Sequence, residues 1–315
     1  MEDAKVIVKV KDLVKHYGKL QALDHLSFEV KEGEIFGLLG PNGSGKSTAI
    51  NCILSLLEYD KGEVEVFDKK MSPDAYDIKQ DIGIVMQNVA VFNELTVYEN
   101  INYFCGLYIK DKKERKNLVE EAIDFVGLND FKKFYPKKLS GGLLRRLNIA
   151  CGIAHKPRLI ILDEPTVAVD PQSRNKILEG IKELNRQGAT VIYTTHYMEE
   201  VEQICTRIMI IDKGKIIASG TKEQLKEMVT IGEKITIETT EINPKQIKNL
   251  NNIEHINSVE YKDNLLIAVS DKDKNNIVEV LNFLQSEQII YDRVYSELPT
   301  LNDVFLELTG KQLRD

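Results

Sequence analysis

The segment from residue 34 to residue 48 constrains the fold of this 315-residue chain more than any other. A short, nearly continuous apolar run, "EIFGLLG" (34–40), leads into "GPNGSGKST" (40–48), and a helical pattern follows. An apolar run of this kind is typical of a buried parallel strand. The loop fits G-x-x-x-x-G-K-[ST] between a strand and a helix. The segment therefore predicts a loop that holds the phosphates of a nucleoside triphosphate.

The residue types in this loop have physical reasons. Gly43 and Gly45 let the backbone fold tightly, so that its N–H groups point at the β-phosphate near the positive end of a helix dipole. Lys46 neutralises the β- and γ-phosphates, Ser47 can place its hydroxyl on Mg²⁺, and Thr48 gives a further hydroxyl. The predicted phosphate-binding residues are Gly40, Pro41, Asn42, Gly43, Ser44, Gly45, Lys46, Ser47 and Thr48.

Strand and helix patterns alternate up to about residue 228. Such alternation predicts an α/β core with a mainly parallel sheet. Pro171 and Gly188 mark the start and end of one predicted helix. Further buried strands are expected at 82–87, 158–165, 189–195 and 207–212, and helices at 113–127, 140–155 and 172–187.

Polar groups end several of these apolar strands. In "LIILDEP" (159–165), Asp163 is expected to hold Mg²⁺ through water. Glu164, the next residue, is the natural general base or water-orienting group. Gln87 follows "IGIVM" and His196 follows "VIYTT". Because ligands of parallel sheets gather at the carboxyl ends of strands, we expect all four side chains to face the nucleotide.

A second helix start is also suited to bind an anion. In "KKLSGGLLRRLNIACG" (137–152), Ser140 is a good N-cap, and Gly141 and Gly142 expose the first backbone N–H groups. An ordinary capped helix would explain this stretch taken alone. The alternative is that this helix closes on the γ-phosphate of ATP held by another copy of the chain, so that ATP joins a dimer.

From about residue 229 the pattern changes. The order β-α-β-β-α-β plus a final helix predicts a small ferredoxin-like α+β domain. We therefore expect two domains, 1–228 and 229–315, and the second contains no catalytic constellation. Its expected strands are 234–240, 256–262, 264–270 and 288–296, and its expected helices are 243–250, 274–287 and 298–310.

The composition of the chain indicates which classes of binding partner and which compartment to expect. The net charge of -7 argues against binding of nucleic acid. The four cysteines lie far apart, which favours reduced core thiols. The charged N-terminus lacks the apolar core of a signal peptide, and no segment approaches the roughly 18–20 apolar residues of a membrane span. Any work at a membrane would need another chain to span it.

Taken together and in this order, "GPNGSGKST", Gln87, "LSGG", "LIILDE", "TVAVD" (166–170) and His196 resemble the nucleotide-binding subunit of an ATP-binding cassette (ABC) transporter. The resemblance covers residues 1–228. It implies a P-loop fold with a mainly parallel sheet, an antiparallel β subdomain and a helical subdomain.

The resemblance also implies roles for single residues. Tyr17, in "KHYGKLQAL", matches the aromatic residue that stacks on adenine, and Gln87 matches the residue that senses Mg²⁺ and water. Asp170 matches the loop that couples two active sites. His196 matches the switch histidine on the γ-phosphate. Ser140 and Gly142 match the groups that contact the γ-phosphate of the opposite subunit, with Gly141 between them.

Two positions depart from the family pattern. Leu143 stands where glutamine is usual, but the phosphate-facing groups are Ser140 and the glycine N–H groups, so we expect it to be tolerated. Ala168 stands where glycine is common. If that position needs a positive φ, alanine costs on the order of 1 kcal/mol, and the geometry of the coupling loop is then in question.

Within the family, "PTVAVDPQSRN" (165–175) and "LPTLNDVFLELTGKQLRD" (298–315) resemble exporters of the ABC-2 type, including daunorubicin-resistance-like proteins. This implies an ATPase at the cytoplasmic face of the membrane, in which two copies sandwich two ATP·Mg²⁺ and drive a separate permease through residues 93–109. One rival is a regulator acting on DNA or ribosomes, and another is a cassette that binds ATP without hydrolysis. The sequence does not identify the cargo.

Overall fold

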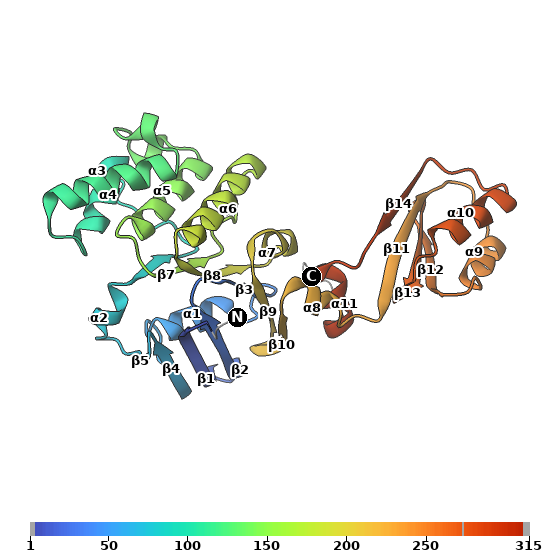
Figure 1. The fold of residues 1–315 in the computed structure, drawn as a ribbon, viewed down its shortest axis with the longest axis horizontal. Helices are drawn as coiled ribbons and strands as arrows, with labels where there is room; N and C mark the ends of the chain where they lie inside the picture. The colour runs from blue at the N-terminus through green and yellow to red at the C-terminus, as the bar shows by residue number, and fades with distance from the viewer. Residues whose placement is uncertain (1–3, 273, 311–315) are drawn as a thin grey trace. The chain divides into compact units, whose positions relative to one another are not determined.

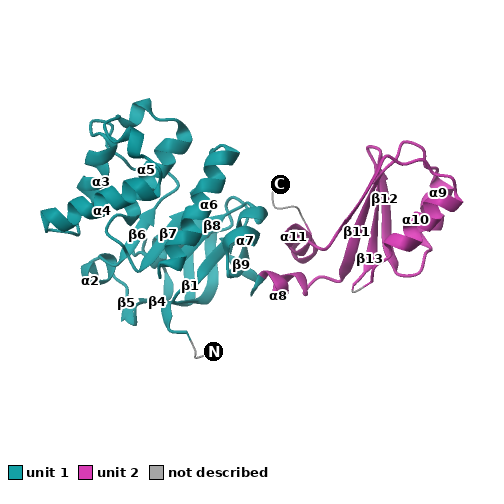
Figure 2. Ribbon diagram, turned by 45° about the horizontal axis from the view of Figure 1, so that its top comes forward, with its two compact units in different colours: residues 1–221, 314–315 teal, residues 222–313 magenta. Residues whose placement is uncertain are grey.

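The computed structural model describes residues 4–272 and 274–310 (Figure 1). It divides into two compact units, with the division between Thr221 and Lys222 (Figure 2). The first unit thus ends before residue 228, because the short helix α8 (Lys222–Lys226) belongs to the second unit. Residues 1–3 and 311–315 of the two expected domains lie outside the described residues.

A six-stranded sheet forms the centre of the first unit, in the order β10-β9-β3-β8-β7-β6. Five strands run parallel and β10 pairs antiparallel with β9, so the expected mainly parallel sheet is confirmed. Every residue of β3, β7 and β8 is buried, which accounts for their continuous apolar runs. The bounds are β3 Ile35–Leu39, β6 Ile82–Val85, β7 Leu159–Asp163, β8 Thr190–Thr195, β9 Arg207–Asp212 and β10 Lys215–Gly220.

A second, antiparallel sheet has the order β2-β1-β4-β5. The family resemblance implied this subdomain, but the sequence pattern did not locate its strands. The cause is a break in alternation, because the register of β1 shifts between Val10 and Leu13 and Asp12 has φ 53°. The bounds are β1 Val6–Tyr17, β2 Leu20–Lys31, β4 Lys61–Val66 and β5 Lys69–Lys70.

Helices α3, α4, α5 and α6 of the first unit begin at side-chain caps. Thr96 forms a capping box with Glu99, and Asp111, Ser140 and Asp170 each accept a backbone N–H at the start of their helices. Helices α3, α4 and α5 pack against one another as a helical subdomain (Figure 1). The bounds are α1 Lys46–Ile53, α2 Tyr76–Lys79, α3 Val97–Gly106, α4 Lys112–Phe125, α5 Gly141–Ile153, α6 Pro171–Arg186 and α7 Met198–Ile204.

The core of the first unit joins its two sheets. Helix α1 contacts both β2 and β7, so the helix that follows the phosphate loop lies between the two sheets. Phe36 of β3 is fully buried and stacks on Phe28 of β2, with ring centroids 5.4 Å apart. This packing fixes the loop between β3 and α1 at the carboxyl edge of the parallel strands.

The second unit is an α+β structure with the element order β11-α9-β12-β13-α10-β14-α11 after α8. Its antiparallel sheet has the strand order β12-β13-β11-β14. Strand β14 begins later than residue 288, because Gln288 has φ 55° and belongs to the preceding turn. The bounds are β11 Ile231–Glu238, α9 Pro244–Asn251, β12 Ile256–Lys262, β13 Leu265–Asp271, α10 Ile277–Ser286, β14 Arg293–Glu297 and α11 Leu301–Thr309.

Candidate functional site

The loop from Gly40 to Gly45 depends on glycine for two reasons. Gly43 and Gly45 have φ of 79° and 109°, which side chains rarely allow. A Cβ on Gly40 would lie 2.2 Å from the carbonyl oxygen of Ile211, and one on Gly45 would lie 2.7 Å from that of Ala22. The loop is therefore fixed both by its own conformation and by close packing.

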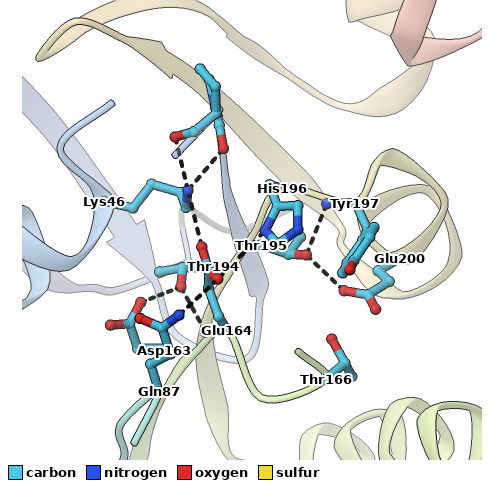
Figure 3. A network of polar contacts seen from close by, with 12 residues as sticks. Lys46, Gln87, Asp163, Glu164, Thr166, Thr194, Thr195, His196, Tyr197 and Glu200 are labelled. Atoms are coloured by element: carbon cyan, nitrogen blue, oxygen red, sulfur yellow. Dashed lines mark hydrogen bonds and ion pairs between the residues drawn. The ribbon is translucent and has the colours of Figure 1, made fainter. Parts of the chain in front are cut away.

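Lys46 extends across the mouth of this loop (Figure 3). Its Nζ donates to the carbonyl oxygens of Gly40, at 2.8 Å, and Pro41, at 3.1 Å. The same atom lies 3.1 Å from Oε1 of Glu164. Both side chains are buried, which makes mutual charge compensation necessary. The structure thus brings together the predicted phosphate ligand and the predicted water-orienting carboxylate.

Glu164 is also the meeting point of the other two strand-end groups (Figure 3). Its Oε2 accepts a hydrogen bond from Nε2 of Gln87 at 3.4 Å and lies 3.5 Å from Nδ1 of His196. The Glu164 backbone has φ 47°, and its N–H donates to the carbonyl and the hydroxyl oxygen of Thr194 at 3.1 and 3.0 Å. Side chains from two other strand ends therefore converge on the Glu164 carboxylate.

Asp163 ends β7 and is almost completely buried. Its Oδ1 accepts a hydrogen bond of 2.5 Å from the Thr194 hydroxyl, which also accepts from the N–H of Glu164. Thr194 therefore orients both acidic residues. Sequence reasoning missed it because its partners lie on a neighbouring strand, 30 and 31 positions earlier in the chain.

A cleft of about 610 Å³ opens over the phosphate loop. Its walls include Tyr17 at the end of β1, whose side chain is half exposed. Lys213, in the turn between β9 and β10, also lines the cleft and was not predicted. The next residue, Gly214, donates its N–H to the Ser44 carbonyl at 2.8 Å, so this turn lies against the phosphate loop. The predicted residues in the lining are Tyr17, Asn42, Gly43, Gly45, Lys46, Ser47, Thr48, Gln87 and Glu164, and the others are Leu20, Gln21, Ala22 and Lys213.

The start of α5 forms a separate cluster. Ser140 Oγ accepts from the N–H of Leu143 at 3.4 Å, which confirms the predicted cap. A Cβ on Gly142 would lie 2.3 Å from Ser173 Oγ and 3.1 Å from Asp170 Oδ2, so this glycine permits close approach of α5 and α6. Asp170 caps α6 through the N–H of Ser173, which lowers the pKa of its carboxyl. Ser140, Gly141, Gly142 and Asp170 are not among the residues that line the cleft.

Ala168 has a φ of 59°, in the left-handed region. The loop therefore does adopt a positive φ at residue 168, the position where the family often has glycine. The strain costs on the order of 1 kcal/mol. Val169 is buried and Ala168 itself is exposed, so the surrounding contacts hold the loop despite the strained residue.

Behind His196 lies a buried polar network that the sequence did not reveal (Figure 3). Glu200 of α7 is nearly fully buried and accepts from Tyr193 OH at 2.8 Å and Thr195 Oγ1 at 2.7 Å. Its other oxygen lies 3.4 Å from Nε of Arg174 on α6. Burial raises the pKa of the Tyr193 hydroxyl, which keeps it a donor. The network ties β8 to the two helices beside the switch position.

Comparison with known proteins identifies the family. Residues 23–167 match the family model described as "ABC transporter". The linearmycin resistance ATP-binding protein of Bacillus subtilis is 40% identical over 98% of this chain and 100% of that protein. The chain belongs to the ATP-binding subunits of ABC transporters. It is an ABC ATPase, and the cassette fold expected from its motifs is confirmed.

Other full-length relatives are export or resistance proteins. A daunorubicin resistance ATP-binding protein of Streptomyces coeruleorubidus is 32% identical over 99% of this ABC subunit and 98% of that protein. The Nod factor export ATP-binding protein I of Sinorhizobium fredii is 33% identical over 98% of this chain and 88% of that protein. The chain is an ATP-binding subunit of the exporter type.

Solved structures add the assembly of such cassettes. A dimeric bacterial ABC transporter cassette is 30% identical, with a TM-score of 0.63 over 68% of this chain and 98% of that one. ABC cassettes thus form dimers. Within residues 4–272 and 274–310, none of the helices has the length and apolar character that crossing a bilayer requires.

Proposed function

We propose that two copies of this ATPase close around two ATP·Mg²⁺, each held between the phosphate loop of one copy and the Ser140–Gly142 helix start of the other. One observation carries this proposal. Lys46, Gln87 and Glu164 line one cleft, whereas Ser140 and Gly142 of the same chain do not. A γ-phosphate contact by that helix start therefore needs a second copy.

The groups around the cleft divide the chemistry among them. The buried Lys46 ammonium already contacts carbonyl and carboxylate oxygens, which are the ligand type that phosphate offers. Glu164 orients or deprotonates the attacking water, while Gln87 and His196 hold its carboxylate from two sides. Tyr17 stacks on the adenine at the open end. Positioning and fixed charge supply the rate enhancement of phosphoryl transfer.

The oxygen donors near the cleft suit Mg²⁺. Ser47 lines the cleft, Gln87 faces it, and Asp163 presents a buried carboxylate held by Thr194. In the part of the chain that the structure describes, no three His, Cys, Asp or Glu side chains form a ready-made metal cage. This agrees with Mg²⁺, which is usually held by one or two protein ligands plus phosphate and water. The ion would neutralise charge on the β- and γ-phosphates.

The partner we propose is a separate integral-membrane permease, which places this subunit at the cytoplasmic face of the membrane. Helix α3 follows the Gln87 loop and belongs to the expected transmission segment 93–109. Its neighbourhood exposes an aromatic group in which Phe92 packs on Tyr103 and Phe104, with ring centroids 4.9 and 5.8 Å apart. The names of the full-length relatives support an antibiotic or drug-like cargo.

The second unit is proposed to be ferredoxin-like and to serve dimer contact or regulation. The order β12-β13-β11-β14 and the alternation of its elements support that fold. Its role rests on fold analogy alone. A chain truncated after the first unit that hydrolyses ATP and dimerises as the full chain does would remove the dimer-contact role.

The test compares the full chain with Glu164→Gln in steady-state ATPase and light-scattering measurements. We expect the variant to bind ATP, to lose turnover by roughly 100-fold or more, and to dimerise only with ATP and Mg²⁺. Lys46→Ala is the control that should neither bind nor dimerise. A Glu164→Gln variant that hydrolyses at the wild-type rate, or that stays monomeric in saturating ATP, would contradict the proposal.

A further inference from the structure

Arg145 lies on α5, one helical turn after the Ser140–Gly142 start, and its side chain is almost completely buried. A buried guanidinium normally pairs with a carboxylate. Among the described residues, every hydrogen-bond partner of the group is a main-chain carbonyl oxygen. The distances are 2.7 Å from Nε to Pro165, 3.0 and 2.8 Å from Nη1 to Met86 and Gln87, and 2.5 and 3.5 Å from Nη2 to Glu164 and Asp163.

These carbonyls belong to two separate segments. Met86 and Gln87 follow β6, whereas the other three residues end or follow β7. The two segments carry Gln87 and Glu164, the side chains that meet over the phosphate loop. The guanidinium therefore holds both segments by their main chains, while the side chains of Gln87 and Glu164 line the cleft.

The geometry at Glu164 makes this support specific. Its φ of 47° is strained for a residue with a side chain, and such a conformation persists only where surrounding groups fix it. The Glu164 N–H is held by Thr194, and its carbonyl receives the shortest of the Arg145 hydrogen bonds. Both ends of the strained residue are thus tied to different elements.

Burial lowers the pKa of Arg145, while the nearby Asp163, Tyr193 and Glu164 oppose that shift. A planar fork with five N–H donors can serve five carbonyls, which a lysine ammonium with three donors cannot match. This match between the guanidinium N–H groups and the main-chain carbonyls is what a group that positions the backbone requires.

We infer that Arg145 is a positioning residue, which couples the helix that contacts one nucleotide to the water-orienting Glu164 and to Gln87 at the other nucleotide of the dimer. This inference rests on the proposed roles of Glu164, Gln87 and Ser140. One rigid helix turn separates the Ser140 cap from the guanidinium. A shift of that helix is therefore passed to the backbone of both cleft residues.

The next residue provides a matched control. Arg146 lies on the same helix and donates to the carbonyls of Val126 and Gly127, at 2.9 and 3.4 Å, which belong to the end of α4 and its turn. Arg146 has the same charge as Arg145 and also donates to main-chain carbonyls. Its acceptors do not belong to the two segments that contain Gln87 and Glu164. Its replacement tests the effect of losing an arginine from α5 alone.

The experiment measures kcat, KM, ATP affinity and thermal unfolding of the full chain as wild type, Arg145→Gln, Arg145→Lys and Arg146→Gln. We expect Arg145→Gln to lower kcat by roughly 10-fold or more while ATP affinity changes less than about 3-fold, and Arg145→Lys to fall between it and wild type. Arg146→Gln should keep kcat within about 2-fold. Rates are divided by the fraction of protein that binds ATP.

A double-mutant cycle with Gln87→Ala separates positioning from general support. If Arg145 acts through Gln87 and Glu164, the combined loss of kcat is smaller than the product of the single losses. Losses that multiply, a wild-type kcat in Arg145→Gln, or equal losses in both arginine variants would each overturn the inference. If Arg145→Gln does not fold, Arg145→Lys decides, since wild-type kcat there would also overturn it.

Glu164→Gln, measured in the same assays, distinguishes a failure of the proposed function from a failure of the role inferred for Arg145. If it keeps turnover, the proposed function itself fails. If it is inactive while Arg145→Gln hydrolyses ATP normally, the proposed function stands and only the role of Arg145 is lost.

Discussion

The chain has two helix starts lined by glycine, at α1 and at α5, and they use glycine differently. At α1, Gly43 and Gly45 have positive φ and the loop itself is bent. At α5, Gly141 and Gly142 are absent from the left-handed region, and Gly142 serves to let α6 approach. The first start needs glycine for its backbone conformation as well as for close packing, whereas the second needs it for space alone.

The surroundings differ in the same sense. The α1 start has Lys46, Glu164 and Gln87 beside it within one chain. The side chains nearest to Gly142 at the α5 start are those of Ser173 and Asp170, neither of which is a cation. Under the proposed function, two similar glycine patterns specify one site that is complete in the chain and one that supplies a contact to another molecule. The predictions below test that distinction.

The largest effect is expected when the two starts are compared in trans. Lys46→Ala removes the phosphate ligand, so it should abolish ATP binding and lower turnover by roughly 100-fold or more. Ser140→Ala should leave ATP binding by a single copy unchanged and lower turnover. ATP titrations at low protein concentration and steady-state ATPase rates measure both.

Mixing these two impaired variants makes the comparison decisive. In a mixed dimer, one nucleotide site has an intact phosphate loop and an intact α5 start, whereas the other site has neither. An equal mixture should recover turnover, up to about a quarter of the wild-type rate, because about half of the dimers are mixed. No recovery would mean that each chain uses its own α5 start.

The next effect separates the two glycine roles by stability. Gly45→Ala forces alanine to a φ of 109° and brings Cβ to 2.7 Å from the Ala22 carbonyl, so it should cost roughly 2–4 kcal/mol of unfolding free energy. Gly141→Ala meets only a carbonyl at 3.9 Å and should change stability by less than about 1 kcal/mol. Denaturant unfolding measures both, and equal costs would contradict the distinction.

Gly142→Ala should cost about 1–3 kcal/mol, because its Cβ would lie 2.3 Å from Ser173 Oγ and 2.7 Å from Ser173 Cβ. The second change Ser173→Gly removes both of these atoms and should restore much of the loss. Chemical unfolding of the single and double variants checks this. A failure of Ser173→Gly to restore stability would show that the glycine is needed for another reason.

The smallest effect concerns the coupling loop beside the α5 start. Ala168→Gly should relieve the strain at φ 59° but adds freedom to the unfolded chain, for a net gain of at most about 0.6 kcal/mol. The melting temperature should rise slightly, with little change in ATP affinity. A loss of stability would mean that the alanine methyl group makes a contact worth more than the strain.

The sequence located the phosphate loop, Asp163, Glu164, Gln87 and His196 because each stands at the end of a short apolar run. Strand ends that are far apart in the chain meet at one edge of a parallel sheet, so a linear pattern was enough. The order of the parallel strands and of the elements of the second unit followed from the same periodicity, whereas β1, β2, β4 and β5 did not.

What the sequence could not provide depends on main-chain partners and on partners from other elements. Arg145 binds only carbonyls, which every residue has, so no residue type at another position points to it. Thr194 and Glu200 act through side chains brought close only by the sheet and by α7. The bulge at Asp12 hid β1, because it breaks the two-residue period that strand recognition requires.

The cap of α5 explains why the residue that follows "LSGG", here Leu143, can vary. A serine hydroxyl has one proton and two lone pairs. Ser140 uses a lone pair to accept from the N–H of Leu143, which leaves its proton to donate to a phosphate oxygen. Leu143 contributes only its main-chain N–H to this arrangement, so the identity of its side chain does not affect the cap. A search pattern that demands glutamine there would pass over this chain, although under the proposed function its phosphate-facing groups are complete.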